Sequence, residues 1–257
     1  MKKIIALILI SAFALFALTS CGAKGKSLDE VKEAGELIIV TSPDFPPFEN
    51  IENGEIVGIE IDIIKLVCEE LGVDAVIKSS DFDSILAGIP AGKYDCAVAG
   101  ITVDSEREKN MLFTTPYYVA AQCIVVPEGS SITSSADLAG KKIAVQTGTT
   151  AESACTDAGY NISAYTANAD AKTALTLGKV DAWVVDNLTA AQMVGAGDGL
   201  VILDEELSAE PYAFAFTFGS EDLVAEIDKI LSELIADGTI EAIFAEYGET
   251  YFKPYVK

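Results

Sequence analysis

The stretch that most constrains the fold runs from residue 94 to residue 118, YDCAVAGITVDSEREKNMLFTTPYY. Residues 95–100 are mostly small and apolar and follow a Gly-Lys pair, which predicts a short buried strand. Ser105 and Glu108 fit the S-x-x-E capping box that opens a helix. A buried strand that leads directly into a helix favours an α/β architecture.

Arg107 falls in the first turn of that predicted helix. A cation is unusual there, because the N-terminus of a helix already carries partial positive charge. Free backbone N–H groups, the Thr102 hydroxyl and the Arg107 guanidinium would together form an anion pocket best suited to a carboxylate. The alternative is a surface arginine paired with Glu106 or Glu108.

The rest of the chain alternates apolar and amphipathic segments. The three prolines of SPDFPPFEN at 42–50 exclude a helix and predict a rigid loop at the carboxyl end of the first strand, where open α/β sheets bind ligands. The TGTTAE segment at 147–152 likewise follows a strand and opens a helix. We expect strands at 36–41, 75–78, 117–126 and 142–146, and helices at 60–71, 134–140, 223–234 and 240–247.

Two segments are similar within the chain. GKYDCAVAG at 92–100 and GKVDAWVVD at 178–186 both begin G-K-x-D and continue as an apolar strand. The first leads to Thr102 and Arg107, and the second ends at Asp186. We therefore expect two similar α/β lobes that place opposite charges at one cleft. The alternative is a coincidence between two common helix-to-strand turns.

Composition excludes several function classes. The chain of 257 residues has a formal charge of −23, which would repel nucleic acid, and it has no basic stripe. It contains no histidine, which excludes Ser-His-Asp and Cys-His catalytic arrangements and histidine-containing metal sites. We expect no metal, no cofactor and no nucleic-acid partner.

The N-terminus resembles a lipoprotein leader. Lys2 and Lys3 precede an apolar segment at 4–18, which is short for a membrane span and fits a signal peptide. The following Leu-Thr-Ser-Cys resembles the bacterial lipobox, in which the leader is removed and the cysteine receives a lipid. We expect a signal peptide at 1–20, lipidation at Cys21 and a tether at 21–35. The alternative is an ordinary signal peptide with an incidental cysteine.

The motifs along the chain resemble those of the family 3 solute-binding proteins of ABC transporters, which mostly carry polar amino acids. The resemblance extends over roughly residues 36–250. The segments that carry it are FPPFE at 45–49, GIEID at 58–62, GKYD at 92–95, AGITVDSERE at 99–108, TTPYY at 114–118, GKKIAVQTGTT at 140–150 and GKVDAWVVD at 178–186.

This resemblance implies an α/β fold of two Rossmann-like lobes with a ligand cleft between them, the periplasmic-binding-protein type II fold with a two-strand hinge. The first lobe would combine residues 36–117 and 215–257. The second would contain residues 121–211, with hinges near 117–121 and 211–215.

The resemblance also implies a site for a free amino acid. Arg107 would hold the carboxylate, helped by threonine hydroxyls, while Asp186 and the Gly100 carbonyl would accept hydrogen bonds from the ammonium group. Phe45 and Phe82 would enclose the ligand, although Phe82 could instead be a hydrophobic staple for the helix that it precedes. The full predicted set is Ser42, Phe45, Phe82, Gly100, Thr102, Arg107, Gln146, Thr149, Thr150 and Asp186.

Two further positions bear on the ligand. The resemblance places Gln146 against the ligand side chain, and Phe48 in the core. Many relatives have an aspartate at the position of Ser42 that also holds the ammonium group. Its absence puts that contact in doubt and argues mildly against a strongly cationic side chain.

Four cysteines follow the leader: Cys68, Cys96, Cys123 and Cys155. They allow three full pairings, and the sequence does not select one. Because Cys68 lies on the apolar face of a predicted helix, and Cys96 and Cys123 lie in apolar strands, we expect buried free thiols.

The function implied by the resemblance is that of a lipid-anchored, monomeric amino-acid receptor on the extracytoplasmic face of the cell membrane. It would deliver its ligand to an ABC permease and its ATPase without catalysis. The alternative is an extracytoplasmic dehydratase that acts on arogenate or prephenate, because a few such enzymes have a similar fold.

Overall fold

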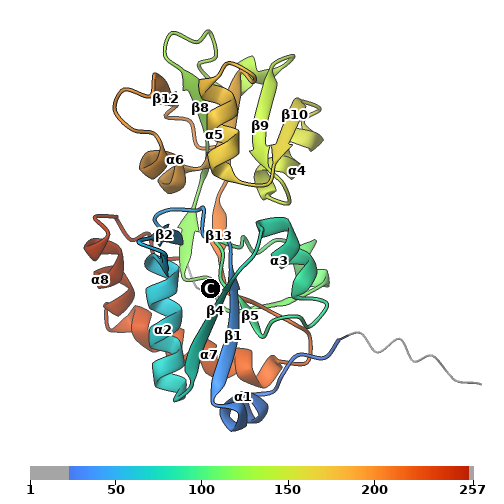
Figure 1. Ribbon diagram of the computed structural model, residues 1–257, viewed down its shortest axis with the longest axis vertical. Helices are drawn as coiled ribbons and strands as arrows, with labels where there is room; N and C mark the ends of the chain where they lie inside the picture. Colours follow the sequence, from blue (N-terminus) through green and yellow to red (C-terminus); the bar gives the residue numbers. More distant parts are fainter. Residues whose placement is uncertain (1–22, 255–257) are drawn as a thin grey trace, which may run out of the picture.

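Two lobes, each built around a five-stranded sheet, make up the protein in a computed structural model that describes residues 23–254 (Figure 1). The predicted signal peptide at 1–20 and the predicted lipidation site Cys21 lie outside the described residues. Within the described range, no helix has both the length and the apolar character needed to cross a membrane.

The first lobe contains the two ends of the described chain. Its strands are β1 (Glu36–Thr41), β4 (Asp74–Ser79), β5 (Cys96–Ala97), β6 (Leu112–Phe113) and β14 (Ala215–Phe216), with a hairpin of β2 (Asn50–Glu52) and β3 (Glu55–Val57). Its helices are α1 (Leu28–Ala34), α2 (Ile59–Leu71), α3 (Phe82–Gly88), α7 (Glu221–Ala236) and α8 (Thr239–Glu246). The sheet order is β4-β1-β5-β14-β6, and β14 is antiparallel to β5.

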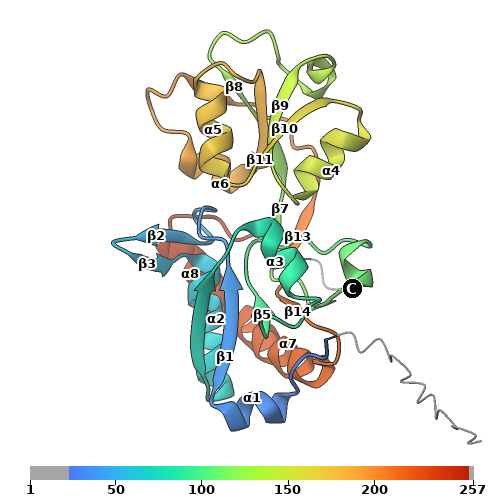
Figure 2. The ribbon, with the colours of Figure 1, turned by 45° about the vertical axis from the view of Figure 1, so that its right-hand side comes forward.

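Helices cover both faces of this sheet (Figure 2). Successive side chains of a strand point to opposite faces. Leu37 and Ile39 of β1 accordingly belong to one apolar cluster with α2, α7 and α8, whereas Val40 belongs to another with α3. The continuous apolar runs in the sequence are explained by burial on both faces.

The second lobe has the same kind of sheet. Its strands are β8 (Gln122–Pro127), β9 (Lys142–Gln146), β10 (Asn161–Tyr165), β11 (Ala182–Asp186) and β12 (Leu200–Ile202), and its helices are α4 (Thr150–Asp157), α5 (Asn168–Thr176) and α6 (Asn187–Met193). The order is β10-β9-β11-β8-β12, with β8 antiparallel to β11. Trp183 packs with α5 and α6, and its neighbour Val184 packs with α4.

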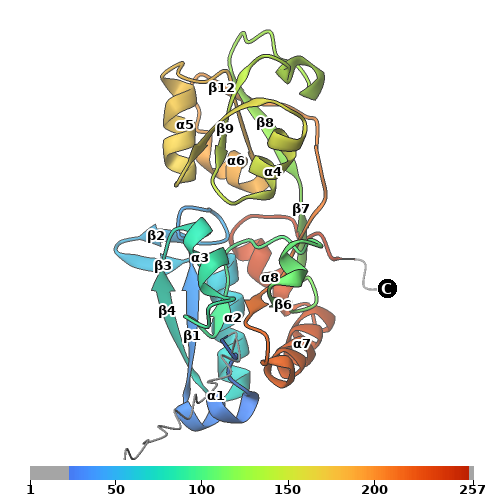
Figure 3. The ribbon, with the colours of Figure 1, turned by 90° about the vertical axis from the view of Figure 1, so that its right-hand side faces the viewer.

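Two strands connect the lobes, as Figures 1 and 3 show. They are β7 (Tyr118–Ala120) and β13 (Glu210–Tyr212), which pair antiparallel. After crossing, the chain enters β8 in the second lobe and β14 in the first, and each becomes the fourth strand of its sheet. This arrangement is the two-strand connection that the sequence predicted.

The internal similarity of the chain corresponds to a structural repeat. The two G-K-x-D segments lead into β5 and β11, which hold the third position in their sheets. Asp95 accepts a hydrogen bond from the N–H of Ile38 at 3.0 Å, and Asp181 accepts one from the N–H of Lys142 at 2.7 Å. In each lobe the aspartate therefore joins the strand that it precedes to the neighbouring parallel strand, so the similarity is no coincidence.

The segment expected to be a tether is partly folded. Ser27 and Glu30 form a capping box that opens α1, and the fully buried Val31 belongs to the core of the first lobe. Lys26 also forms an ion pair with Asp95 at 2.9 Å. The prediction of a tether up to residue 35 is therefore wrong for the part that forms α1, because an amphipathic turn there covers the end of β1.

The four cysteines after the leader are free and buried, as predicted. Cys68 and Cys96 lie in the core of the first lobe, and Cys123 and Cys155 lie in two separate apolar clusters of the second.

Candidate functional site

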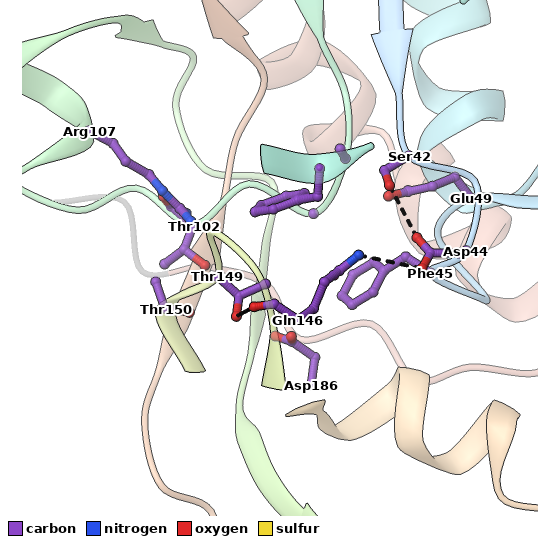
Figure 4. A pocket seen from close by; sticks show the side chains of 13 residues that line it. Ser42, Asp44, Phe45, Glu49, Thr102, Arg107, Gln146, Thr149, Thr150 and Asp186 are labelled. Atoms are coloured by element: carbon purple, nitrogen blue, oxygen red, sulfur yellow. Dashed lines mark hydrogen bonds between the residues drawn. The ribbon is translucent and has the colours of Figure 1, made fainter. Parts of the chain in front are cut away.

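A cavity between the lobes contains all ten residues that the sequence predicted to bind ligand (Figure 4). About 320 Å³ of space, part of it open to solvent, lies between its walls. Asp44, Glu49 and Ala99 also line it and were not predicted. The predicted roles of the ten residues stay predictions, but their convergence on one cavity is a structural fact.

Arg107, the only arginine of the chain, reaches the cavity from a different local structure than expected. The Ser105–Glu108 capping box does not form, and residues Arg107–Lys109 make a single 3-10 turn. The reason is that Asp104 accepts the N–H groups of both Glu106 and Arg107 at 2.8 Å. The prediction of a helix N-terminus beneath the anion pocket is therefore wrong. The positive charge of the pocket comes from the Arg107 guanidinium instead.

The guanidinium of Arg107 bridges the two lobes. It donates from Nη1 to the carbonyl of Thr102 at 2.8 Å and from Nη2 to the carbonyl of Gly148 at 3.1 Å. It also lies 5.7 Å from the centroid of the Phe82 ring and pairs with Asp104 at 3.5 Å. Burial lowers the pKa of Arg107 from its usual value, an effect that nearby carboxylates oppose. The side chain is held in place and keeps N–H donors for an anion.

The second predicted loop forms as expected. Thr149 caps α4 by accepting the N–H of Glu152 at 3.2 Å, and its hydroxyl donates to the carbonyl of Gln146 at 2.7 Å. The hydroxyl of Thr150, the first residue of α4, instead donates a hydrogen bond to Glu210.

Glu210 accepts hydrogen bonds from two threonine hydroxyls that were predicted to bind the ligand. Thr102 donates to its carboxylate at 2.7 Å and Thr150 donates at 2.9 Å. Ser208 also donates to Glu210. A hydroxyl has one proton, so a ligand carboxylate at Arg107 would compete with Glu210 for the two threonines.

Asp186 stands at the carboxyl end of β11 and faces the cavity. Its carboxylate accepts hydrogen bonds from the hydroxyl of Tyr212 and from Gln122 at 3.0 Å. Burial raises the pKa of Asp186 to about 7, a shift that these hydrogen bonds limit. A cation in the cavity would therefore stabilise its ionised form.

Asp44 places a carboxyl group next to Ser42, the position at which many relatives have an aspartate. Ser42 donates a hydrogen bond to Asp44 Oδ1 at 3.1 Å, and Asp44 Oδ2 accepts the N–H of Asn168 at 2.7 Å and the Gln146 amide at 3.4 Å. Burial raises the pKa of Asp44, while these hydrogen bonds oppose the shift. The carboxylate belongs to the first lobe and is held by the second, so it forms a further contact across the cleft.

The aromatic residues Phe45 and Phe82 line the cavity. Phe45 stacks on Phe48 with the ring centroids 5.5 Å apart, and Phe48 is fully buried, as predicted. Phe82 lines the cavity as the first residue of α3. Because a hydrophobic staple requires the residue before the helix cap, the staple alternative is wrong.

The unpredicted acids could only partly have been found from the sequence. Asp44 and Glu49 lie in the proline-rich loop that was expected at the cleft, so their position was a usable signal. Glu210 lies in a strand that links the lobes, and nothing in its neighbourhood in the sequence marks it as a partner of Thr102.

Taken together, the cavity is suited to a small zwitterion. The cation of Arg107 and the acid of Asp186 come from different lobes, and Phe45 lines the same cavity (Figure 4). The lining residues that the structure describes include no other cation.

Comparisons with known proteins agree with this geometry. The family model described as bacterial extracellular solute-binding proteins, family 3, matches residues 37–250. The chain is 30% identical over 222 residues to the L-cystine-binding protein TcyJ of Escherichia coli (strain K12), covering 84% of each protein. It is 30% identical over 250 residues to the arginine-binding extracellular protein ArtP of Bacillus subtilis (strain 168), covering 95% of this chain and 96% of ArtP.

Solved structures are similar as well. A mutant of ArgBP from T. maritima is 35% identical with a TM-score of 0.82, covering 87% of this chain and 99% of that one. The ancestral amino acid-binding protein AncCDT-1, a precursor of cyclohexadienyl dehydratase, is 32% identical with a TM-score of 0.79, covering 86% and 98%. The chain therefore has the periplasmic-binding-protein type II fold.

Proposed function

Because the chain belongs to the bacterial extracellular solute-binding proteins, family 3, we propose that it is the substrate-binding component of an ABC importer for a free polar amino acid. It would bind the amino acid by closure of the cleft, deliver it to the permease and its ATPase, and catalyse no reaction. The relatives named for cystine and arginine support an amino-acid ligand.

The observation that carries the proposal is a pair of opposite charges contributed by opposite lobes to one cavity. Arg107 follows β5 of the first lobe and would bind the carboxylate, and Asp186 ends β11 of the second lobe and would bind the ammonium group. Both groups of an α-amino acid sit on one carbon atom. One ligand can therefore satisfy both residues only when the lobes are close together, so binding shifts the population toward the closed cleft.

Contacts across the cleft support closure as the mode of binding. Arg107 meets the Gly148 carbonyl, and Asp44 meets the N–H of Asn168. We propose hinges near 117–121 and 211–215, where β7 and β13 join the lobes. The lobes would then contain residues 36–117 with 215–257, and residues 121–211.

Different site residues would contact different parts of the ligand. Phe45 and Phe82 would enclose its body, and Gln146 would face its side chain. Burial of a charged ligand is tolerable only if each charge has a partner, which the two charged residues supply.

Anchoring remains a proposal from the sequence alone. Cleavage before Cys21 and lipidation of its thiol would hold a monomeric protein on the extracytoplasmic face of the cell membrane. Treatment of cells with a labelled fatty acid should label the wild type and not Cys21→Ser.

The proposal is tested by a thermal-shift screen of the mature chain, residues 21–257 with Cys21→Ser, against the amino acids and cystine. A ligand present at about a thousandfold its Kd adds about 4 kcal/mol of stability. We expect such a shift with one or a few amino acids and its loss in Arg107→Ala.

Lys109→Ala is the matched control. It removes the same charge two residues away, from an exposed side chain that pairs with Glu106 at the surface. It should keep the shift. The absence of any shift in a folded protein would contradict the proposal, and turnover of prephenate or arogenate would favour the dehydratase alternative.

A further inference from the structure

We propose that the cavity takes an amino acid with a cationic side chain, and that this cation displaces a proton shared by Glu49 and Glu60. The inference rests on the proposed function and specifies the class of ligand. It is carried by two buried carboxyl groups that none of the roles assigned above uses.

Glu49 and Glu60 are both fully buried, and Glu49 lines the cavity. Glu60 Oε2 accepts the N–H of Gly100 at 2.8 Å. As two carboxylates, they would leave both oxygens of Glu49 and Oε1 of Glu60 without a donor among the described residues. Buried polar atoms in native proteins are almost always paired. One shared proton pairs two of these three oxygens, because the two side chains then hydrogen-bond each other.

The groups around this pair also disfavour two negative charges. The charges of Asp44 and Asp186 help to raise the pKa of Glu49. The charge of Glu60 in turn helps to raise the pKa values of Tyr212 and Cys96. Burial, with the negative charge of Glu60, raises the pKa of Glu49 well above its usual range. Burial also raises the pKa of Glu60, although the hydrogen bonds from Glu49 and Gly100 oppose that shift. The protons of such a pair belong to the pair and not to either residue alone.

At the end of the cavity away from Arg107, the acidic side chains have no cationic partner among the described lining residues. Arg107 and Asp186 match the carboxylate and ammonium of any amino acid. Asp44 and Glu49 remain, and they lie together at the opposite end of the cavity from Arg107 (Figure 4). The serine at position 42 argued mildly against a cationic side chain, but Asp44 and Glu49 provide acids within the same loop. A guanidinium or ammonium group fits this end.

The exchange conserves atoms and charge. In the free protein, the O–H of one glutamic acid donates to the other carboxylate. When an N–H donor of the ligand cation reaches Glu49, that O–H bond breaks, the proton leaves to solvent, and the ligand N–H takes its place. A cation replaces a proton, so the total charge of the pair and its partner is unchanged. Neutral ligands cannot make this exchange.

Calorimetry in two buffers of different ionisation enthalpy tests the inference on the mature chain, with arginine and glutamine as probes. We expect arginine to bind more tightly than glutamine and to release close to one proton more per ligand, since the ionisation of Asp186 by the α-ammonium group is common to both ligands. By linkage, full release of one proton raises the affinity for arginine tenfold per pH unit. Glu49→Gln should abolish this difference in proton release between the two ligands and weaken arginine binding at least tenfold.

Glu52→Gln is the control, since it removes the same charge from an exposed position three residues away. It should leave proton release unchanged. Tighter binding of glutamine than of arginine would overturn the inference but leave the proposed function standing. Equal proton release with arginine and with glutamine in the wild type would also overturn it, whether or not the variant folds. Failure of every amino acid to bind would overturn both.

Discussion

Replacing Gly100 by alanine should damage both folding and ligand binding through the ring of Phe45. Gly100 has φ +53°, a left-handed conformation that costs an L side chain about 1–2 kcal/mol. The added Cβ would lie 2.5 Å from Cε1 and 3.0 Å from Cδ1 of Phe45. Carbon atoms in contact normally lie about 3.5–4.0 Å apart, so the ring would have to move by about 1 Å.

The direction of that movement is limited. Phe45 is stacked on Phe48, which is fully buried in the core of the first lobe. Displacement therefore carries the ring toward the cavity, where the ligand would lie. The backbone cost and an overpacking cost of about 1–3 kcal/mol together predict a loss of about 2–5 kcal/mol in the free energy of unfolding. Ligand Kd should rise at least about tenfold, or 1.4 kcal/mol.

Gly159→Ala separates the two contributions. Gly159 has φ +73°, and a Cβ there would meet nothing within 4 Å. It should lose only the backbone contribution, about 1–2 kcal/mol, with ligand binding unchanged. Urea unfolding and calorimetry measure both quantities. Equal losses of stability in the two variants, with unchanged Kd in Gly100→Ala, would refute the reasoning that Phe45 is held rigidly against Gly100.

Two further predictions concern titrating groups. Burial raises the pKa of Asp186 to about 7, so the folded protein holds a proton that the unfolded chain has released above about pH 4. The free energy of unfolding of the ligand-free protein should therefore fall as the pH rises from about 4 to 7, and Asp186→Asn should reduce this slope in pH-dependent urea melts; an unchanged slope would contradict it. Burial also raises the pKa of Cys68 and Cys155 to about 11 and that of Cys123 to about 12. Ellman's reagent at pH 8 should therefore react slowly with the native Cys21→Ser protein. After denaturation, the reagent should react with four thiols. Fewer than four would indicate a disulfide.

Local sequence patterns determined the parts of the fold that depend on neighbouring residues. The apolar run at 142–146 and the glycine at 72 correspond to the bounds of β9 and to the left-handed residue that ends α2. The two G-K-x-D segments marked equivalent strands, and the residues after those strands placed Arg107 and Asp186 at one cleft. Strand ends can be recognised locally, and open α/β sheets bind ligands at the carboxyl ends of their strands.

The tertiary structure decided which polar groups pair. Ser105 and Glu108 had the spacing of a capping box, but Asp104 took the N–H groups of Glu106 and Arg107. Thr102 donates to Glu210, which is 108 residues away, and Asp44 accepts from Asn168, 124 residues away. No local pattern contains such pairs, because a hydrogen bond is assigned by the competition among all donors and acceptors that folding brings within about 3 Å. The shared proton of Glu49 and Glu60 likewise follows from their burial together against Gly100, which only the packing of the first lobe brings about.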